Sequence, residues 1–229
     1  MSIDLEPILL SLKLALITTV LLLIISIPIS SFLAYRSFRG KPVIETIISL
    51  PLVLPPSVLG FYLLIAFSPQ NFLGEFIQNN FGLQLVFSFP GLIIGSIIYS
   101  LPFMVHPLQA GFQELPLQLR EASYVLGKSR FQTLFKVLLP NIKSSLLTGI
   151  VLTFAHTLGE FGVVLMIGGN IDGETRVASI AIYDAVEALN FGVAHIYSII
   201  LIVISFAILL ITYGLNKKLL NSVFRHGSN

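Results

Sequence analysis

The chain has 229 residues, of which 55% are hydrophobic and only 10% are charged, and its mean hydropathy is +0.92. Soluble domains carry about 25% charged residues, so this composition excludes an ordinary cytosolic enzyme and a disordered protein. The net charge of +2 argues against a nucleic-acid-binding protein, and the absence of cysteine excludes disulfides and thiolate metal sites. These properties predict an all-α, polytopic membrane protein of one domain, without a metal site.

Five segments are apolar and long enough to cross a bilayer, which takes about 20 residues of helix. In chain order they are residues 9–35, 43–67, 89–112, 142–168 and 194–215. Each should be helical, because an open strand would leave backbone groups unpaired in lipid. Prolines such as Pro55 and Pro56 predict interrupted spans. The interruptions could mark mobile helices that line a pathway, or reflect only the higher proline content of membrane helices.

The basic residues predict the orientation, because cytoplasmic loops are enriched in lysine and arginine. With the N-terminus outside, all 13 basic residues except Lys13 and Arg176 fall in or next to cytoplasmic segments. We therefore expect five spans with the N-terminus outside and the C-terminus inside. Residues 113–141 then form a cytoplasmic loop, and residues 169–193 form an external connection with a short amphipathic stretch.

The cytoplasmic loop predicts two short helices separated by a stop. Leu117–Leu126 consists of good helix formers, Gly127 suits a left-handed C-cap, and Ser129 can cap the second helix. The second helix should present a single apolar face, made of Phe131, Leu134, Phe135 and Leu138. Such a loop could dock a partner protein or lie on lipid headgroups.

The loop resembles a known motif at its fixed positions. Glu121, Ala122 and Ser123, then Gly127, then Val137-Leu-Leu-Pro140 are similar to the EAA loop of ATP-binding cassette (ABC) importer permeases, with Ser123 in place of an alanine and Val137 in place of an isoleucine. The resemblance implies that the first helix docks on a cytoplasmic ATPase. The coupling residues would be Glu121, Ala122, Ser123, Leu126 and Gly127. ATP would be used by that partner, so this chain would hold no cofactor and no catalytic residue.

Further segments are similar to the permease subunit of molybdate ABC importers, over nearly the whole chain. They are Leu50–Pro56, Leu158–Gly162 and Gly169–Arg176. Sulfate and tungstate permeases share parts of these motifs, so all three oxyanions stay open as substrates. The resemblance implies a homodimer around a translocation path in the inner (plasma) membrane, two ATPase subunits and a periplasmic or extracellular oxyanion-binding protein.

Energetics also favour an ATP-driven importer. Moving each negative charge into a cell that is negative inside costs about 2.3 kcal/mol per 100 mV, and this chain has no energy source of its own. The alternative of a different class is an ion-driven secondary anion transporter, which would usually show repeated halves and intramembrane charges.

Five residues are candidates for the translocation path or a gate. They are Pro55, Pro56, His156, Gly159 and Glu160. Glu160 lies well inside the fourth span, where a carboxylate could act at a gate or dimer interface, or could make an inter-helix hydrogen bond that fixes packing. His156 could line a path or make a packing hydrogen bond, and Gly159 and Gly162 should permit close helix approach.

Overall fold

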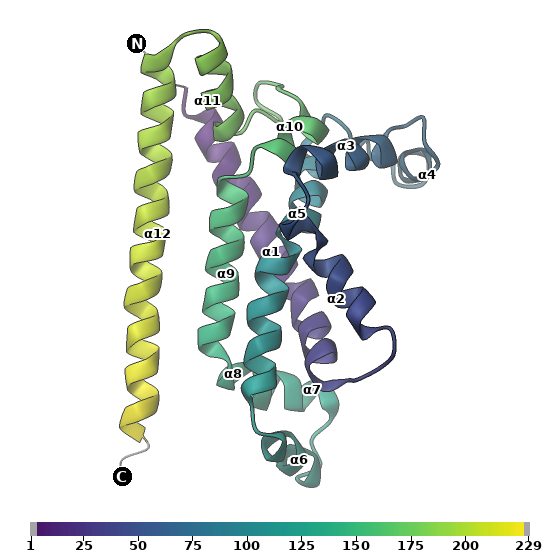
Figure 1. Cartoon of the computed structure of the whole chain (residues 1–229), viewed down its shortest axis with the longest axis vertical. Helices are drawn as coiled ribbons and strands as arrows, with labels where there is room; N and C mark the ends of the chain where they lie inside the picture. Colours follow the sequence, from purple (N-terminus) through teal and green to yellow (C-terminus); the bar gives the residue numbers. More distant parts are fainter. Residues whose placement is uncertain (1–3, 227–229) are drawn as a thin grey trace.

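The computed structural model describes the backbone of residues 4–226 and the side chains of residues 4–212 and 214, and every regular element in this part of the chain is helical (Figure 1). The elements are α1 (Glu6–Tyr35), α2 (Lys41–Ser49), the 3₁₀ turn η1 (Leu50–Leu52), α3 (Pro56–Phe67), α4 (Phe72–Phe81), α5 (Phe89–Glu114), α6 (Leu117–Val125), α7 (Arg130–Thr133), the π-helical segment η2 (Leu134–Leu138), α8 (Leu139–Asn141), α9 (Lys143–Leu158), α10 (Gly162–Gly168), α11 (Ala178–Glu187) and α12 (Phe191–His226). The predicted all-α class is confirmed.

Several helices could cross a membrane. In the described residues, α1, α5 and the Phe191–Thr212 part of α12 are long and apolar enough on their own. Two bent pairs raise the number to as many as five: Lys41–Leu52 with α3, at an angle of 109°, and Arg130–Asn141 with α9, at 82°. Proline explains the larger bend, because Pro51, Pro55 and Pro56 cannot donate backbone hydrogen bonds. The predicted interruption of the second segment is therefore confirmed.

The segment predicted at residues 142–168 is also interrupted. It consists of α9 and α10, and the helix breaks between them at Gly159, Glu160 and Phe161. The predicted external amphipathic stretch is α11, and the connection before α5 contains the additional helix α4.

Helix α5 is the centre of the fold, and 50% of the residues in its most apolar stretch are buried. Helix α12 stands at the edge, where only 11% of the corresponding residues are buried (Figure 1). Two apolar clusters surround α5. Near α10 the first contains Leu92, Val163 and Ile167, and near the 113–141 loop the second contains Leu108, Phe112 and Leu138. The loop is thus attached to the core through α5 and η2.

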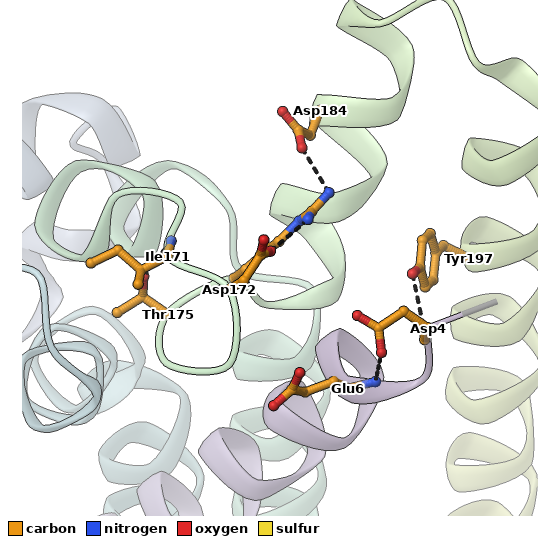
Figure 2. A network of polar contacts seen from close by, with 8 residues as sticks. Asp4, Glu6, Ile171, Asp172, Thr175, Asp184 and Tyr197 are labelled. Carbon is orange, nitrogen blue, oxygen red and sulfur yellow. Dashed lines mark hydrogen bonds and ion pairs between the residues drawn. The ribbon is translucent and has the colours of Figure 1, made fainter. Parts of the chain in front are cut away.

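A polar network closes the end of the molecule opposite the loop (Figure 2). Arg176 pairs with Asp172 at 2.6 Å and with Asp184 at 2.7 Å, which ties the α10–α11 connection to α11. The Tyr197 hydroxyl donates to the Asp4 carbonyl at 2.7 Å, so the start of α1 is held against α12.

Candidate functional site

The 113–141 loop forms the predicted helix–stop–helix arrangement. Helix α6 ends in a Schellman motif, in which the Gly127 N–H donates to the Tyr124 carbonyl at 2.9 Å and the Lys128 N–H to the Ser123 carbonyl at 3.1 Å. Gly127 has φ +75°, and a Cβ placed on it would meet nothing within 4 Å. Glycine is therefore favoured here by backbone conformation and not by lack of space.

The second helix of the loop begins as predicted at Ser129. The Ser129 hydroxyl accepts from the Gln132 N–H, and the Gln132 side chain accepts from the Ser129 N–H, both at 3.2 Å. This capping box satisfies two helix-end donors reciprocally.

A buried hydrogen bond joins the two loop helices, and the sequence analysis missed it. The Ser123 and Thr133 hydroxyls are 2.9 Å apart, and both residues are buried. Ser123 occupies a position where the EAA motif has an alanine. This difference from the motif is the one feature of the sequence that pointed to a polar contact here. The bond fixes the coupling helix candidate α6 against α7.

The loop presents an exposed apolar surface. Val125 is 88% exposed, Leu126 77% and Phe131 70%, while Glu121 and Ala122 are also exposed. The predicted apolar face of the second helix is divided between the core and the surface. Leu138 is buried in the core and Leu134 packs against it, whereas the Phe131 and Phe135 rings, 4.5 Å apart, remain exposed. The π-helical segment η2 changes the residue spacing, which divides the face.

The two broken segments pack against each other where Pro56 at the start of α3 meets Gly162 at the start of α10. Pro55 caps α3 and Pro56 is its first residue. A Cβ on Gly162 would lie 2.7 Å from the Pro56 Cβ, so α10 approaches α3 as closely as a glycine permits. The predicted close approach is confirmed at Gly162, but at Gly159 a Cβ would meet only ordinary contacts, the nearest at 3.7 Å.

Glu160 lies in the break between α9 and α10 and is 4% exposed. Neither of its carboxyl oxygens has a hydrogen-bond partner in the described residues, although the Ser96 side chain lies beside it. Ser96 lies on α5, so the side-chain contact of Glu160 is between helices as expected, although it does not reach hydrogen-bond geometry. The Glu160 backbone carbonyl also accepts from the Ser179 hydroxyl at 2.6 Å. An unpaired buried carboxyl is costly, so this position is a strong candidate for a functional or assembly role.

His156 makes the contacts of a packing residue. Its Nδ1 lies 2.9 Å from the Ser100 hydroxyl, which also contacts the Thr157 hydroxyl at 3.0 Å. Its ring stacks on Phe103 with centroids 4.0 Å apart. His156 thus joins the end of α9 to α5, four residues before Glu160.

The sequence is similar to those of known transport permeases. Relatives include the molybdenum transport system permease protein ModB of Azotobacter vinelandii, 44% identical over 212 residues that cover 92% of this chain and 93% of the relative. A putative molybdenum permease protein of Bacillus subtilis is 34% identical, covering 89% of each chain. A probable sulfate transport system permease protein of Chlorella vulgaris is 37% identical over 175 residues, covering 76% of this chain and 65% of the relative.

Solved structures share the fold. A bacterial ABC transporter for alginate has a TM-score of 0.75 at 18% identity, covering 93% of this chain and 79% of that one. The inward-facing MetNI methionine ABC transporter has a TM-score of 0.70 at 16% identity, covering 93% and 94%. A family profile described as "Binding-protein-dependent transport system inner membrane component" matches residues 26–221. With this match over most of its length, the chain belongs to the family of binding-protein-dependent transport system inner membrane components.

Proposed function

We propose that this chain is the transmembrane permease subunit of an ATP-driven ABC importer for molybdate. Membership of the permease family is shown by the profile match, and the observation that carries the substrate is the 44% identity to a molybdenum permease over nearly both whole chains. The protein is a single transmembrane domain without catalytic residues or a cofactor of its own. ATP is hydrolysed by the partner subunit.

The proposed topology is five spans in the inner membrane, with the N-terminus outside. Helices α1, α5 and α12 and the bent pair that ends in α3 support four of these spans. The fifth candidate, Arg130–Asn141 with α9, shares only α9 with the proposed span 142–168, because Arg130–Asn141 belongs to the proposed loop. The arginines and lysines of the 113–141 loop lie at one end of the molecule and the acidic Asp172 and Asp184 near the other, which agrees with the positive-inside rule (Figures 1 and 2).

The bend before α3 supports a homodimer with the path at its two-fold interface. Between η1 and α3 the helix is interrupted, and Val53 is 82% exposed in the single chain. Non-helical backbone at membrane depth is tolerated only where protein covers it or where it lines a water-filled cavity. A second copy placed against Pro55 and Pro56 would satisfy this requirement, and two-fold dimers are the commonest closed assembly.

Coupling is proposed to run through the loop. The exposed surface around Glu121 and Leu126 would sit in a cleft of the ATPase, and the Ser123–Thr133 bond would transmit its movement to α7 and then to α9. The external binding protein would deliver the anion. Selectivity would reside mostly in that protein, in agreement with a membrane region almost free of cations.

Co-purification tests this proposal first. The tagged chain, extracted from its native host in mild detergent, should carry a stoichiometric ABC ATPase, and Glu121→Lys should release it while membrane insertion stays normal. Arg39→Glu, which also reverses a charge near the cytoplasmic face but outside the loop, is the matched control. Recovery of a homo-oligomer without an ATPase would overturn the importer proposal and favour an ion-driven transporter.

The sulfate-permease relative makes sulfate the second candidate substrate. In the reconstituted complex, with its binding protein present, molybdate uptake should be inhibited by unlabelled molybdate and tungstate far more strongly than by sulfate. Equal inhibition by sulfate would reject molybdate as the preferred substrate.

A further inference from the structure

A basic cavity lies where the 113–141 loop meets the end of α1. Its volume is about 520 Å³, within the range of small-ligand sites. It is lined from four elements. The polar residues include Tyr35 and Arg36 at the end of α1, Arg120 and Tyr124 on α6, and Arg130 on α7, and η2 adds the apolar Leu134 and Leu138. Figure 1 shows these elements together at one end of the molecule.

The charge of this cavity is uncompensated. Its lining contains three arginines and no aspartate or glutamate. Among the described residues, ion pairs are made by Lys41 and Arg176 but by none of these three arginines. Arg36 and Arg130 are exposed and Arg120 is half-buried, so the three guanidinium groups together favour an anion in this space.

Two donors of the cavity wall are also unsatisfied. The Arg120 Nε and the Tyr35 hydroxyl are both buried, and neither has a hydrogen-bond partner in the described part of the chain. Buried donors in native proteins are nearly always paired, so each indicates a missing acceptor. The Arg120 guanidinium lies over the Tyr35 ring, 4.5 Å from its centroid, which holds both groups in place beside the cavity.

We infer that this cavity is a binding site for a tetrahedral oxyanion of the phosphate type. Arginine forks match the oxygens of such a group bidentately, and the tyrosine hydroxyl supplies a further donor. The anion comes either from the phosphodiester of an anionic lipid or from a free oxyanion in solution. The end of α1 lies near headgroup depth in the proposed topology, and basic pockets between helices on that side suit lipid headgroups.

A bound anion would connect α1 to both loop helices. It would hold α6 and α7 against the bundle and so bias the position of the coupling helix candidate. The site is separate from the proposed translocation path, and its occupancy can be measured without any transport. The inference therefore does not depend on which anion is transported.

The test measures binding to the purified full-length chain. Native mass spectrometry counts retained dioleoylphosphatidylglycerol against dioleoylphosphatidylcholine, and a second arm titrates inorganic phosphate while following thermal unfolding. Arg120→Gln should weaken binding about ten- to hundredfold, the usual effect of losing a charge-assisted hydrogen bond. Tyr35→Phe, which keeps the ring contact and removes only the hydroxyl, should weaken it less. Arg39→Gln, an exposed arginine outside the cavity lining, should leave binding unchanged.

Each outcome decides the proposal. Retention of phosphatidylglycerol that Arg120→Gln abolishes identifies a lipid site, and stabilisation by inorganic phosphate that the same variant abolishes identifies a free-oxyanion site. Binding in neither arm, or equal losses in Arg120→Gln and Arg39→Gln, would overturn the proposal.

Discussion

Replacing Gly127 is the sharpest perturbation of the proposed coupling loop, because the structure separates backbone conformation from steric space at this residue. Its φ of +75° is in the left-handed region, while a Cβ would meet nothing within 4 Å. A non-glycine residue in this conformation costs about 1–2 kcal/mol, and a β-branched residue is disfavoured further. We expect Gly127→Val to reduce the population of the native turn by about tenfold or more.

A graded series isolates this effect. Gly127→Asn should keep most of the ATP-dependent uptake, because asparagine visits the left-handed region readily, whereas Gly127→Ala should be intermediate and Gly127→Val lowest. Gly82→Val is the matched control: Gly82 also ends a helix, at φ +65° and with open space around it, but lies in the connection after α4. It should cost similar local strain without affecting coupling.

The assay is uptake by the reconstituted importer, normalised to the amount of assembled complex, together with hydrogen exchange of residues 117–133. Equal uptake for all three Gly127 variants would refute the requirement for a left-handed stop. Equal loss in Gly82→Val would show that general destabilisation, and not the turn, explains the effect.

Three further predictions concern packing and ion pairs. Ser123→Ala should lower stability by about 1–3 kcal/mol, because it leaves the buried Thr133 hydroxyl without its partner; thermal unfolding should show most of the loss restored in the Ser123→Ala/Thr133→Val double variant. Gly162→Val should destabilise the α3–α10 contact by about 1–3 kcal/mol, because the new side chain overlaps Pro56, whereas Gly159→Ala should unfold at nearly the native temperature. Arg176→Gln should cost about 1 kcal/mol or less, and this loss should shrink at high salt, since the pairs with Asp172 and Asp184 are partly exposed; a loss that is unaffected by salt would contradict a mainly electrostatic role.

Local features of the fold could be predicted from the sequence because a few residues determine them. Gly127 favours a left-handed helix end and Ser129 favours a helix N-cap, and the structure contains both features at these residues. The prolines before α3 remove backbone donors wherever they lie, so the interruption followed from composition alone. The apolar segments likewise gave the all-helical class.

Features that depend on contacts between distant segments could not be predicted. The arginine cavity joins Arg36 to Arg120 and Arg130, and nothing in the spacing of these residues indicates that α1 ends beside the loop. The apolar face of the second loop helix was divided by a π-helical segment, which sequence periodicity does not reveal. The burial of the Glu160 carboxyl also depends on the helix break around it. The sequence showed only that a carboxylate inside an apolar segment is unusual.

The loop can transmit movement only if it is stiffer than its contacts with the rest of the chain. The Schellman motif, the Ser129 capping box and the buried Ser123–Thr133 bond link α6 and α7 into one hydrogen-bonded unit. Leu138 and Ile142 attach this unit to the cluster around α5, next to the 82° bend that leads into α9. On the α1 side the unit meets the basic cavity. There the Arg120–Tyr35 contact already joins α6 to α1, and a bound anion would add a second connection. Its presence should therefore strengthen the link between α1 and the loop in the proposed coupling.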